Sequence, residues 1–188
     1  MKKPFIVIEG QDRTGKSTLV NQLANFYGPG AVKSHSSSPP KDLSYPDNKI
    51  WEDNNYFKLF NLYDTITETN AVITDRFHLG MYVFGKRFRK YPERYHVTDI
   101  ERLVTISNNT FLILLTDDPK ELMKRDDGMS YEKSESDFAE TAFEFQIEYA
   151  RSLIPNKLHI NITVNGGFNN TYETVLKFIE SKRYANSV

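Results

Sequence analysis

The chain alternates short, fully apolar runs with longer segments in which apolar residues recur every three or four positions. Three runs, residues 5–8, 71–74 and 110–116, are typical of strands buried on both faces. Two weaker runs, residues 31–35 and 157–164, predict two more strands. Strands that alternate with helical segments predict an α/β domain with a mostly parallel sheet.

Helical periodicity fills the stretches between these runs. A helix after the third apolar run can be capped by Asp117 or Asp118, with Pro119 in its first turn. The charged stretch that follows, residues 126–137, has no periodicity and is expected to be a lid-like segment. The predicted helices cover residues 17–27, 50–68, 98–106, 119–125, 138–153 and 171–182.

Length and composition narrow the class of protein. A chain of 188 residues can bury one sizeable core, so we expect a single domain over residues 1–188. The net charge of −1 argues against binding to DNA or membranes by bulk electrostatics. The absence of cysteine excludes disulfides, zinc thiolates and cysteine nucleophiles. The longest apolar runs, about five residues each, are too short for a signal peptide or a membrane span, so we expect a cytoplasmic protein.

The first apolar run leads into a phosphate-binding loop. Residues 10–17, GQDRTGKS, fit the pattern G-x-x-x-x-G-K-[ST] and lie between a predicted strand and a predicted helix. In such a loop, backbone N–H groups and the helix N-terminus bind phosphate oxygens. Lys16 would reach the β- and γ-phosphates of ATP, and Ser17 would bind a magnesium ion. A chance glycine turn is the alternative, but the flanking strand and helix argue against it.

The loop carries a second cation, Arg13. An arginine in this place can stabilise the charge that develops on a transferring phosphoryl group, an effect of about 10³–10⁵ in rate in other enzymes. The alternative is a surface arginine that contacts nearby carboxylates.

Two motifs together resemble a known family. The loop and a second motif at the end of the strand 71–74 are similar to those of thymidylate kinase and its deoxynucleotide kinase relatives. The resemblance implies a P-loop NTPase fold: a five-stranded parallel sheet with helices on both faces. It also implies a homodimer that transfers the γ-phosphoryl group of ATP to a nucleoside monophosphate. The matching residues are Glu9-Gly10-x-Asp12-Arg13-x-Gly15-Lys16-Ser17-Thr18 and Thr74-Asp75-Arg76-Phe77.

The resemblance assigns roles residue by residue. Asp12 would contact the acceptor sugar, and Arg76 would bind the acceptor phosphate. Asp75 would lie near the magnesium ion or the reacting oxygens. Phe84 would pack against the 2′ carbon of the sugar and disfavour ribose, and Arg125 would lie near ATP. The loop residues expected at ATP are Gly10, Asp12, Arg13, Thr14, Gly15, Lys16, Ser17 and Thr18.

Each of these residues also has a structural interpretation. Asp75 can cap or pair at a strand end, and Arg76 can pair with it. Phe84 can belong to the core. Arg125 can simply be a cation at a helix C-terminus.

The sequence departs from the family pattern at the acceptor site. No arginine lies between Arg13 and Arg76, and the lid-like segment has only Lys133 as a cation. Thymine specificity is therefore in doubt. A neutral aromatic pocket could stack a base instead, although aromatic residues at helical spacing are also typical of a core. The residues considered for this pocket are Phe57, Phe60, Tyr63, Phe77 and Tyr82, with Asn61 as a possible reader of the base edge.

A run of cations follows the second motif. Residues 85–91, GKRFRKY, and Arg94 place five cations among aromatic residues. Such a run can contact nucleic acid, but it is more often a solvated face, and it could also attract anionic nucleotides. One alternative function is therefore a kinase that acts on a nucleoside, a polynucleotide end or a modified base. Another is a nucleotide-binding switch without catalysis.

Overall fold

The computed structural model describes residues 3–35, 38–65, 70–91, 97, 99–102, 109–125, 128 and 130–185. Strands and helices alternate along this part of the chain. The elements are β1 (Phe5–Gly10), α1 (Lys16–Tyr27), β2 (Ala31–His35), α2 (Asp47–Thr65), β3 (Ala71–Asp75), α3 (His78–Phe88), β4 (Thr110–Thr116), α5 (Pro119–Met123), α6 (Glu135–Arg151), β5 (Asn156–Asn161) and α7 (Phe168–Ala185).

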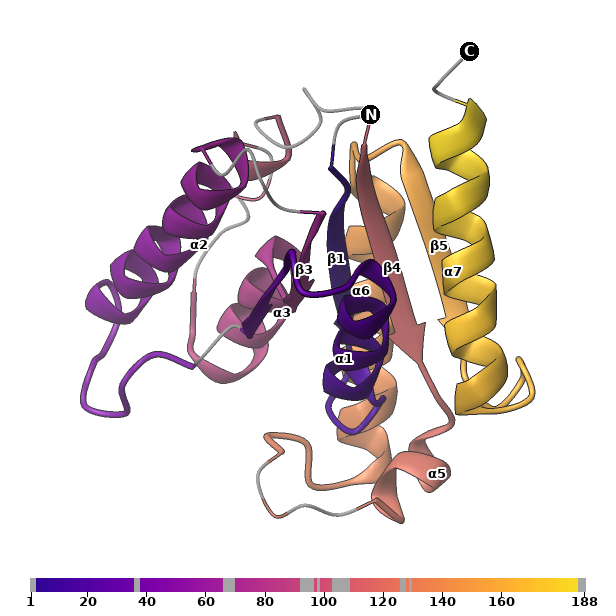
Figure 1. Cartoon of the computed structure of the whole chain (residues 1–188). Helices are drawn as coiled ribbons and strands as arrows, with labels where there is room; N and C mark the ends of the chain where they lie inside the picture. Colours follow the sequence, from indigo (N-terminus) through magenta and orange to yellow (C-terminus); the bar gives the residue numbers. More distant parts are fainter. Residues whose placement is uncertain are drawn as a thin grey trace.

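The five strands form one parallel sheet with the order β2-β3-β1-β4-β5. β1 lies in the centre, and its Ile8 is opposite Asp75 of β3 and Ile113 of β4. The loops that follow β1 and β3 therefore meet at the carboxyl edge of the sheet, at the lower end in Figure 1. Ligands of open parallel sheets bind at this edge.

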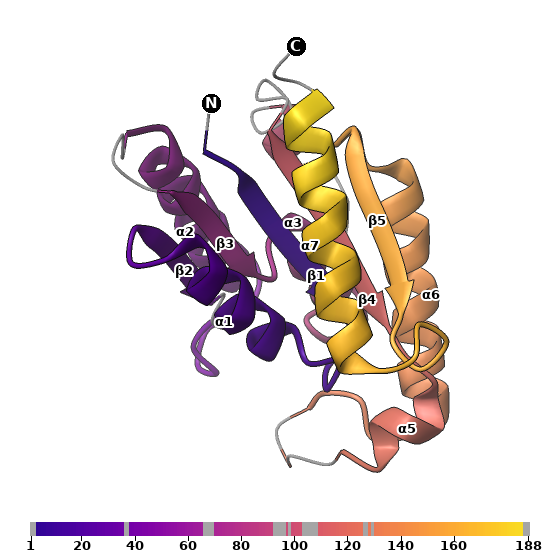
Figure 2. The same ribbon diagram turned by 45° about the vertical axis from the view of Figure 1, so that its right-hand side comes forward.

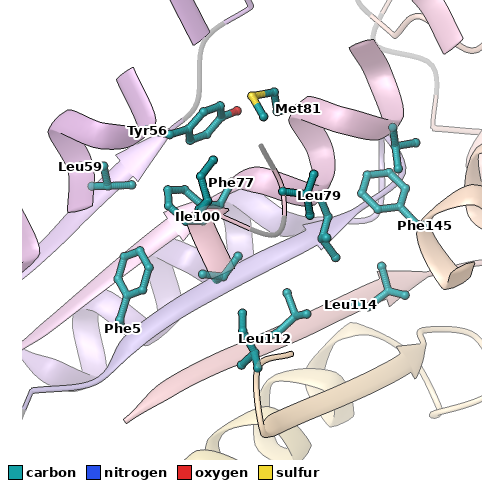
Figure 3. Packing of buried hydrophobic residues seen from close by; sticks show 14 of the residues in the cluster. Phe5, Tyr56, Leu59, Phe77, Leu79, Met81, Ile100, Leu112, Leu114 and Phe145 are labelled. Atoms are coloured by element: carbon teal, nitrogen blue, oxygen red, sulfur yellow. The ribbon is translucent and has the colours of Figure 1, made fainter. Parts of the chain in front are cut away.

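Helices cover both faces of the sheet, and each face has its own apolar core. Phe5 and Val7 of β1 point into the core beneath α2, α3 and α6, part of which is shown in Figure 3. Ile6 and Ile8 point the other way, into the core beneath α1 and α7 (Figure 2). All four side chains are fully buried, because a central parallel strand is covered on both faces.

The predicted strands are confirmed, and the main differences concern helix and strand ends. β5 ends at Asn161, three residues early, because residues 162–166 form a turn. Asp118 caps α5 by accepting a hydrogen bond from the Lys120 amide. A capping box between Ser134 and Asp137 starts α6 at Glu135, so the last three residues of the predicted lid are helical.

One helix was not predicted, and another lies largely outside the described residues. α3 contains Gly80 and Gly85, which lower its helix propensity, and seven of its eleven residues are buried. Of the predicted helix 98–106, only residues 99–102 are described, and these are helical. Within the described part of the chain, no helix combines the length and apolar character needed to cross a membrane.

Candidate active site

The phosphate-binding loop has the backbone that its glycines predict. Gly10 and Gly15 have φ values of 139° and 75°, which favour glycine. A Cβ atom on Gly10 would lie 2.0 Å from the Leu115 carbonyl oxygen, so a side chain cannot fit there. The loop ends where α1 begins at Lys16, so the positive end of this helix faces the loop. This arrangement is suited to an anion.

Lys16 is buried at the loop with its ammonium directed back onto the backbone. Its Nζ donates a short hydrogen bond to the Gln11 carbonyl oxygen and lies 3.5 Å from the Thr14 hydroxyl. Burial, helped by the nearby Arg76 charge, lowers the pKa of Lys16 to about 8, although neighbouring carboxylates oppose the shift. A bound phosphate would give this ammonium an anionic partner in place of the neutral Gln11 carbonyl.

Ser17 and Asp75 bring two oxygen ligands together at the carboxyl edge of the sheet. The Ser17 hydroxyl donates to Asp75 Oδ2 at 2.5 Å, and His35 Nδ1 lies 3.2 Å from the same oxygen. Among the described residues, no group of three His, Cys, Asp or Glu side chains could hold a metal alone. Magnesium commonly takes only one or two protein oxygens and completes its shell with phosphates and water. The Ser17 and Asp75 pair fits that mode of binding.

Arg76 lies where the second motif turns away from β3. It has a φ of 67°, and its guanidinium forms an ion pair with Asp12. The same guanidinium stacks 4.2 Å from the centre of the Phe84 ring. Burial works against ionisation of Asp12, but the charges of Arg76 and Lys16 outweigh it and hold the pKa of Asp12 below its ordinary value.

Glu9 fixes the position of this turn. Its fully buried carboxylate accepts hydrogen bonds from the amides of Phe77, Leu79 and Gly80 at 2.9–3.0 Å. These amides belong to the start of α3, which has no side-chain cap of its own. Glu9 thus ties the end of β1 to the residues that follow Arg76. The sequence motif includes Glu9 but gives no hint of this role.

A hollow of about 140 Å³ opens beside Arg76. Phe84 and Asp12 line it as the resemblance implies, but Phe57 does not line it and is 38% exposed. The Phe60 side chain lies outside the described part of the structure. Of the other aromatic residues considered, Phe77 and Tyr63 are buried in the core. Three lining residues that the sequence did not single out are Glu52, Tyr56 and Tyr131, and a fourth, Arg89, belongs to the run of cations at residues 85–91.

A second hollow, of about 340 Å³, lies on the other side of the loop. Arg13, Thr14 and Gly15 line it, together with Arg125 and Phe168. Arg125 is held by an ion pair with Asp117 at 2.7 Å and a hydrogen bond to the Arg13 carbonyl at 3.3 Å. A planar guanidinium on a loop wall can stack on a nucleotide base. This hollow is therefore a candidate for the nucleoside end of ATP.

The Arg13 side chain points toward the lid-like segment. Its Nε donates to the Ser130 hydroxyl at 2.8 Å, and its Nη1 donates to the Leu122 carbonyl at 3.3 Å. The guanidinium also lies 5.2 Å from the centre of the Phe138 ring. Arg13 therefore joins the phosphate-binding loop to residues on both sides of the lid-like segment.

The lid-like segment contributes a buried acid. Glu132 is fully buried, and burial together with the Asp12 charge raises its pKa to about 7. The Tyr131 amide lies 3.4 Å from Asp12 Oδ2. Residues 126, 127 and 129 of the predicted lid lie outside the described residues. The described part therefore contacts Asp12 and lines the hollow beside Arg76 through Tyr131.

The cations of residues 85–91 are largely paired. Lys86 contacts Glu144 at 2.8 Å, Arg87 contacts Glu140 at 3.0 Å, and Arg89 pairs with Glu52. Arg94 lies outside the described residues. Because carboxylates of α6 and α2 neutralise these side chains, the described part of this run gives no support to a nucleic-acid contact.

Comparison with known proteins supports the fold. No protein-family model and no curated protein sequence matches the chain. Among solved structures, the chain is similar to the YorR protein from Bacillus subtilis in complex with phosphorylated GDP, with a TM-score of 0.68, 19% identity, and coverage of 96% of this chain and 98% of that one. It is also similar to thymidylate kinase from Candida albicans, with a TM-score of 0.60, 17% identity, and coverage of 97% and 93%.

A further similar structure is thymidylate kinase from Ehrlichia chaffeensis, with a TM-score of 0.55, 15% identity, and coverage of 86% and 88%. At these identities the similarity concerns the fold. It confirms the expected five-stranded parallel sheet with helices on both faces and the expected resemblance to thymidylate kinase structures.

Proposed function

We propose that this chain is a nucleoside monophosphate kinase that transfers the γ-phosphoryl group of ATP to a deoxynucleoside monophosphate. One observation carries the proposal: the phosphate-binding loop lines two hollows at once. Asp12 borders the hollow at Arg76, while Arg13 to Gly15 border the hollow at Arg125. Two nucleotides bound in these hollows would meet with their phosphates at the loop.

Different side chains would bind the phosphates, the magnesium ion and the acceptor during phosphoryl transfer. An oxygen of the acceptor phosphate attacks the γ-phosphorus, the bond to the β,γ-bridging oxygen breaks, and ADP leaves. Lys16 would turn from the Gln11 carbonyl to the β- and γ-phosphates. Ser17 and Asp75 would hold a magnesium ion, whose charge would offset that of the same phosphates. Arg76 would exchange Asp12 for the acceptor phosphate and align it for attack.

We call the hollow beside Arg76 the acceptor hollow, and the position of Phe84 in it supports a deoxynucleotide as acceptor. Phe84 is held rigidly, since its ring packs against Phe88, Tyr131 and Phe145 at centroid distances of 5.6–5.9 Å. A fixed aromatic ring would leave little room for a 2′-hydroxyl. The similar structures support a kinase too, because two are thymidylate kinases and one contains phosphorylated GDP. We also expect a homodimer, as the family resemblance implies.

A coupled assay of ADP release tests the proposal. The protein is mixed with Mg·ATP and, in turn, with nucleoside monophosphates, nucleosides and a single-stranded oligonucleotide. ADP should form only when a monophosphate is present. Lys16→Ala should abolish the signal, whereas Lys33→Ala, which removes an exposed lysine that donates to Asn21 Oδ1, should retain it. ADP release that ignores the acceptor, or that needs the oligonucleotide, would contradict the proposal.

A further inference from the structure

The acceptor hollow contains an ion pair that the proposed transfer does not use. Glu52 comes from α2 and Arg89 follows the last residue of α3, and both line the hollow. Their side chains are only 3% and 12% exposed. The sequence did not predict that the two residues pair, because 37 positions separate them.

The local structure holds Glu52 in one orientation. Arg89 Nη1 donates to one carboxylate oxygen, and the Tyr91 hydroxyl donates to the other at 2.6 Å. Arg89 and Tyr91 are fixed in turn, because their amides both donate to the Gly85 carbonyl at 3.0 Å. The Tyr91 ring occupies the space of a side chain at Gly85, where a Cβ atom would lie 2.1 Å from the ring. The turn after α3 is therefore shaped around this carboxylate.

Stability alone does not explain the pair. Burying two charges costs about as much as their attraction returns, and apolar side chains of similar size often do as well or better. Burial raises the pKa of Glu52 even though Arg89 opposes the shift, which shows that desolvation of this carboxylate is costly. The pair also keeps capacity for further hydrogen bonds. Arg89 Nε is buried without a partner in the described structure, and an ionised carboxylate can accept about four hydrogen bonds.

We propose that Glu52 and Arg89 recognise guanine as the base of the acceptor nucleotide. The inference rests on the proposed kinase function and names its substrate. Guanine places two N–H donors, N1–H and the N2 amino group, side by side on one edge, where they match the two oxygens of a carboxylate. The neighbouring O6 and N7 are acceptors and match a guanidinium, which is the commonest partner of guanine in proteins that read bases.

The other bases fit this pair less well. Cytosine and adenine each offer one amino group next to a ring nitrogen that carries a lone pair, so one carboxylate oxygen would face another acceptor. Thymine has no amino group, and its single N3–H lies between two carbonyl oxygens. A buried carboxylate oxygen that faces a lone pair is both unsatisfied and repelled. Sites built on hydrogen bonds discriminate strongly against analogues that leave such groups unpaired.

The test compares dGMP, dTMP, dCMP and dAMP as acceptors in the coupled assay, at saturating ATP. The kcat/KM for dGMP should exceed each of the others by about 100-fold or more, since each good base contact contributes about 5- to 150-fold in discrimination and the pair makes two such contacts. Glu52→Gln replaces one acceptor oxygen by an amide donor. It should lower kcat/KM for dGMP by about 100-fold, mainly through KM, and should leave that for dTMP equal or higher.

Two controls separate recognition from a loss of structure. Glu144→Gln changes a carboxylate that pairs with exposed Lys86 and does not line the hollow, and should leave the order of preference unchanged. Arg89→Lys keeps the charge but loses the planar fork, and should raise KM for dGMP more than for dTMP. Thermal unfolding of each variant checks its fold. The comparison of the four monophosphates on the unaltered protein tests the guanine assignment without any variant.

The outcomes are distinct. Phosphorylation of another monophosphate in preference to dGMP would overturn the guanine assignment and leave the kinase function intact. An equal loss for all acceptors in Glu52→Gln would also overturn it, because the pair would then act only through structure. Failure of every monophosphate would instead overturn the proposed function.

Discussion

Removal of the Arg76 guanidinium should weaken acceptor binding and leave ATP binding unchanged. This group pairs with Asp12 and stacks on Phe84. It lines the acceptor hollow and does not line the hollow assigned to ATP. Arg76→Ala should therefore raise the KM of the acceptor with a much smaller effect on the KM of ATP.

The size of the increase in KM follows from the exchange of Asp12 for the acceptor phosphate at Arg76. A hydrogen bond to a charged group contributes about 1.5–3 kcal/mol, and a guanidinium can donate two to a phosphate. Because Arg76 must first leave Asp12, only part of that energy favours binding. We expect a net loss of about 2–3 kcal/mol, which corresponds to an increase in KM of about 30- to 150-fold.

The measurement is a steady-state titration of the acceptor at saturating ATP, with ADP release as the signal. Arg87→Ala is the matched control, because this arginine lies on α3, does not line the hollow beside Arg76, and pairs with exposed Glu140. The acceptor KM of this variant should stay within about twofold of that of the unaltered protein, since Arg87 does not line the hollow. An unchanged acceptor KM in Arg76→Ala would refute the assignment, and so would an equal increase in the KM of ATP.

Three further predictions concern the loop, the lid-like segment and the turn after α3. Arg13→Ala should lower kcat by about two orders of magnitude with little change in ATP affinity, as rapid-mixing kinetics and calorimetry would show, whereas equal losses would indicate a ground-state role. Because the pKa of Glu132 is raised from 4.5 to about 7, the folded protein holds this proton more tightly than the unfolded chain, and its stabilising effect should be lost as the pH rises through this range. In Glu132→Gln the unfolding free energy should depend less on pH between 4.5 and about 7. An unchanged pH dependence would contradict the raised pKa of buried Glu132. Gly85→Ala should destabilise the fold by about 1–3 kcal/mol in urea unfolding, because its Cβ would collide with Tyr91, and a change below 0.5 kcal/mol would show that the ring moves aside at no cost.

The strands and the phosphate-binding loop could be predicted because their signals are local. Residues 5–8 of β1 and 111–115 of β4 are uninterrupted apolar runs, and the glycine spacing of residues 10–17 follows directly from the backbone the loop must adopt. α3 escaped prediction because it is only eleven residues long and contains two glycines, which lower its helix propensity. A helix of this kind shows its role only when its neighbours are in place.

The acceptor hollow could be predicted only in part. Asp12, Arg76 and Phe84 were inferred from motif positions, and the structure places all three at one hollow. Glu52, Arg89 and Glu132 come from three separate segments and pair across long stretches of chain. No local pattern reports such pairing. Phe57 has an aromatic ring that could stack on a base, but its position on α2 leaves it partly exposed, and it does not line the hollow.

The most direct test of the central claim follows the fate of the γ-phosphate itself. ATP labelled at the γ-position is incubated with the protein, magnesium and dGMP, and the products are separated by thin-layer chromatography. If the γ-phosphoryl group is transferred to dGMP, label should appear in the deoxyguanosine diphosphate, in an amount equal to the ADP formed. Label that appears only as inorganic phosphate, or that remains in ATP with every monophosphate offered, would contradict transfer between two nucleotides across this loop.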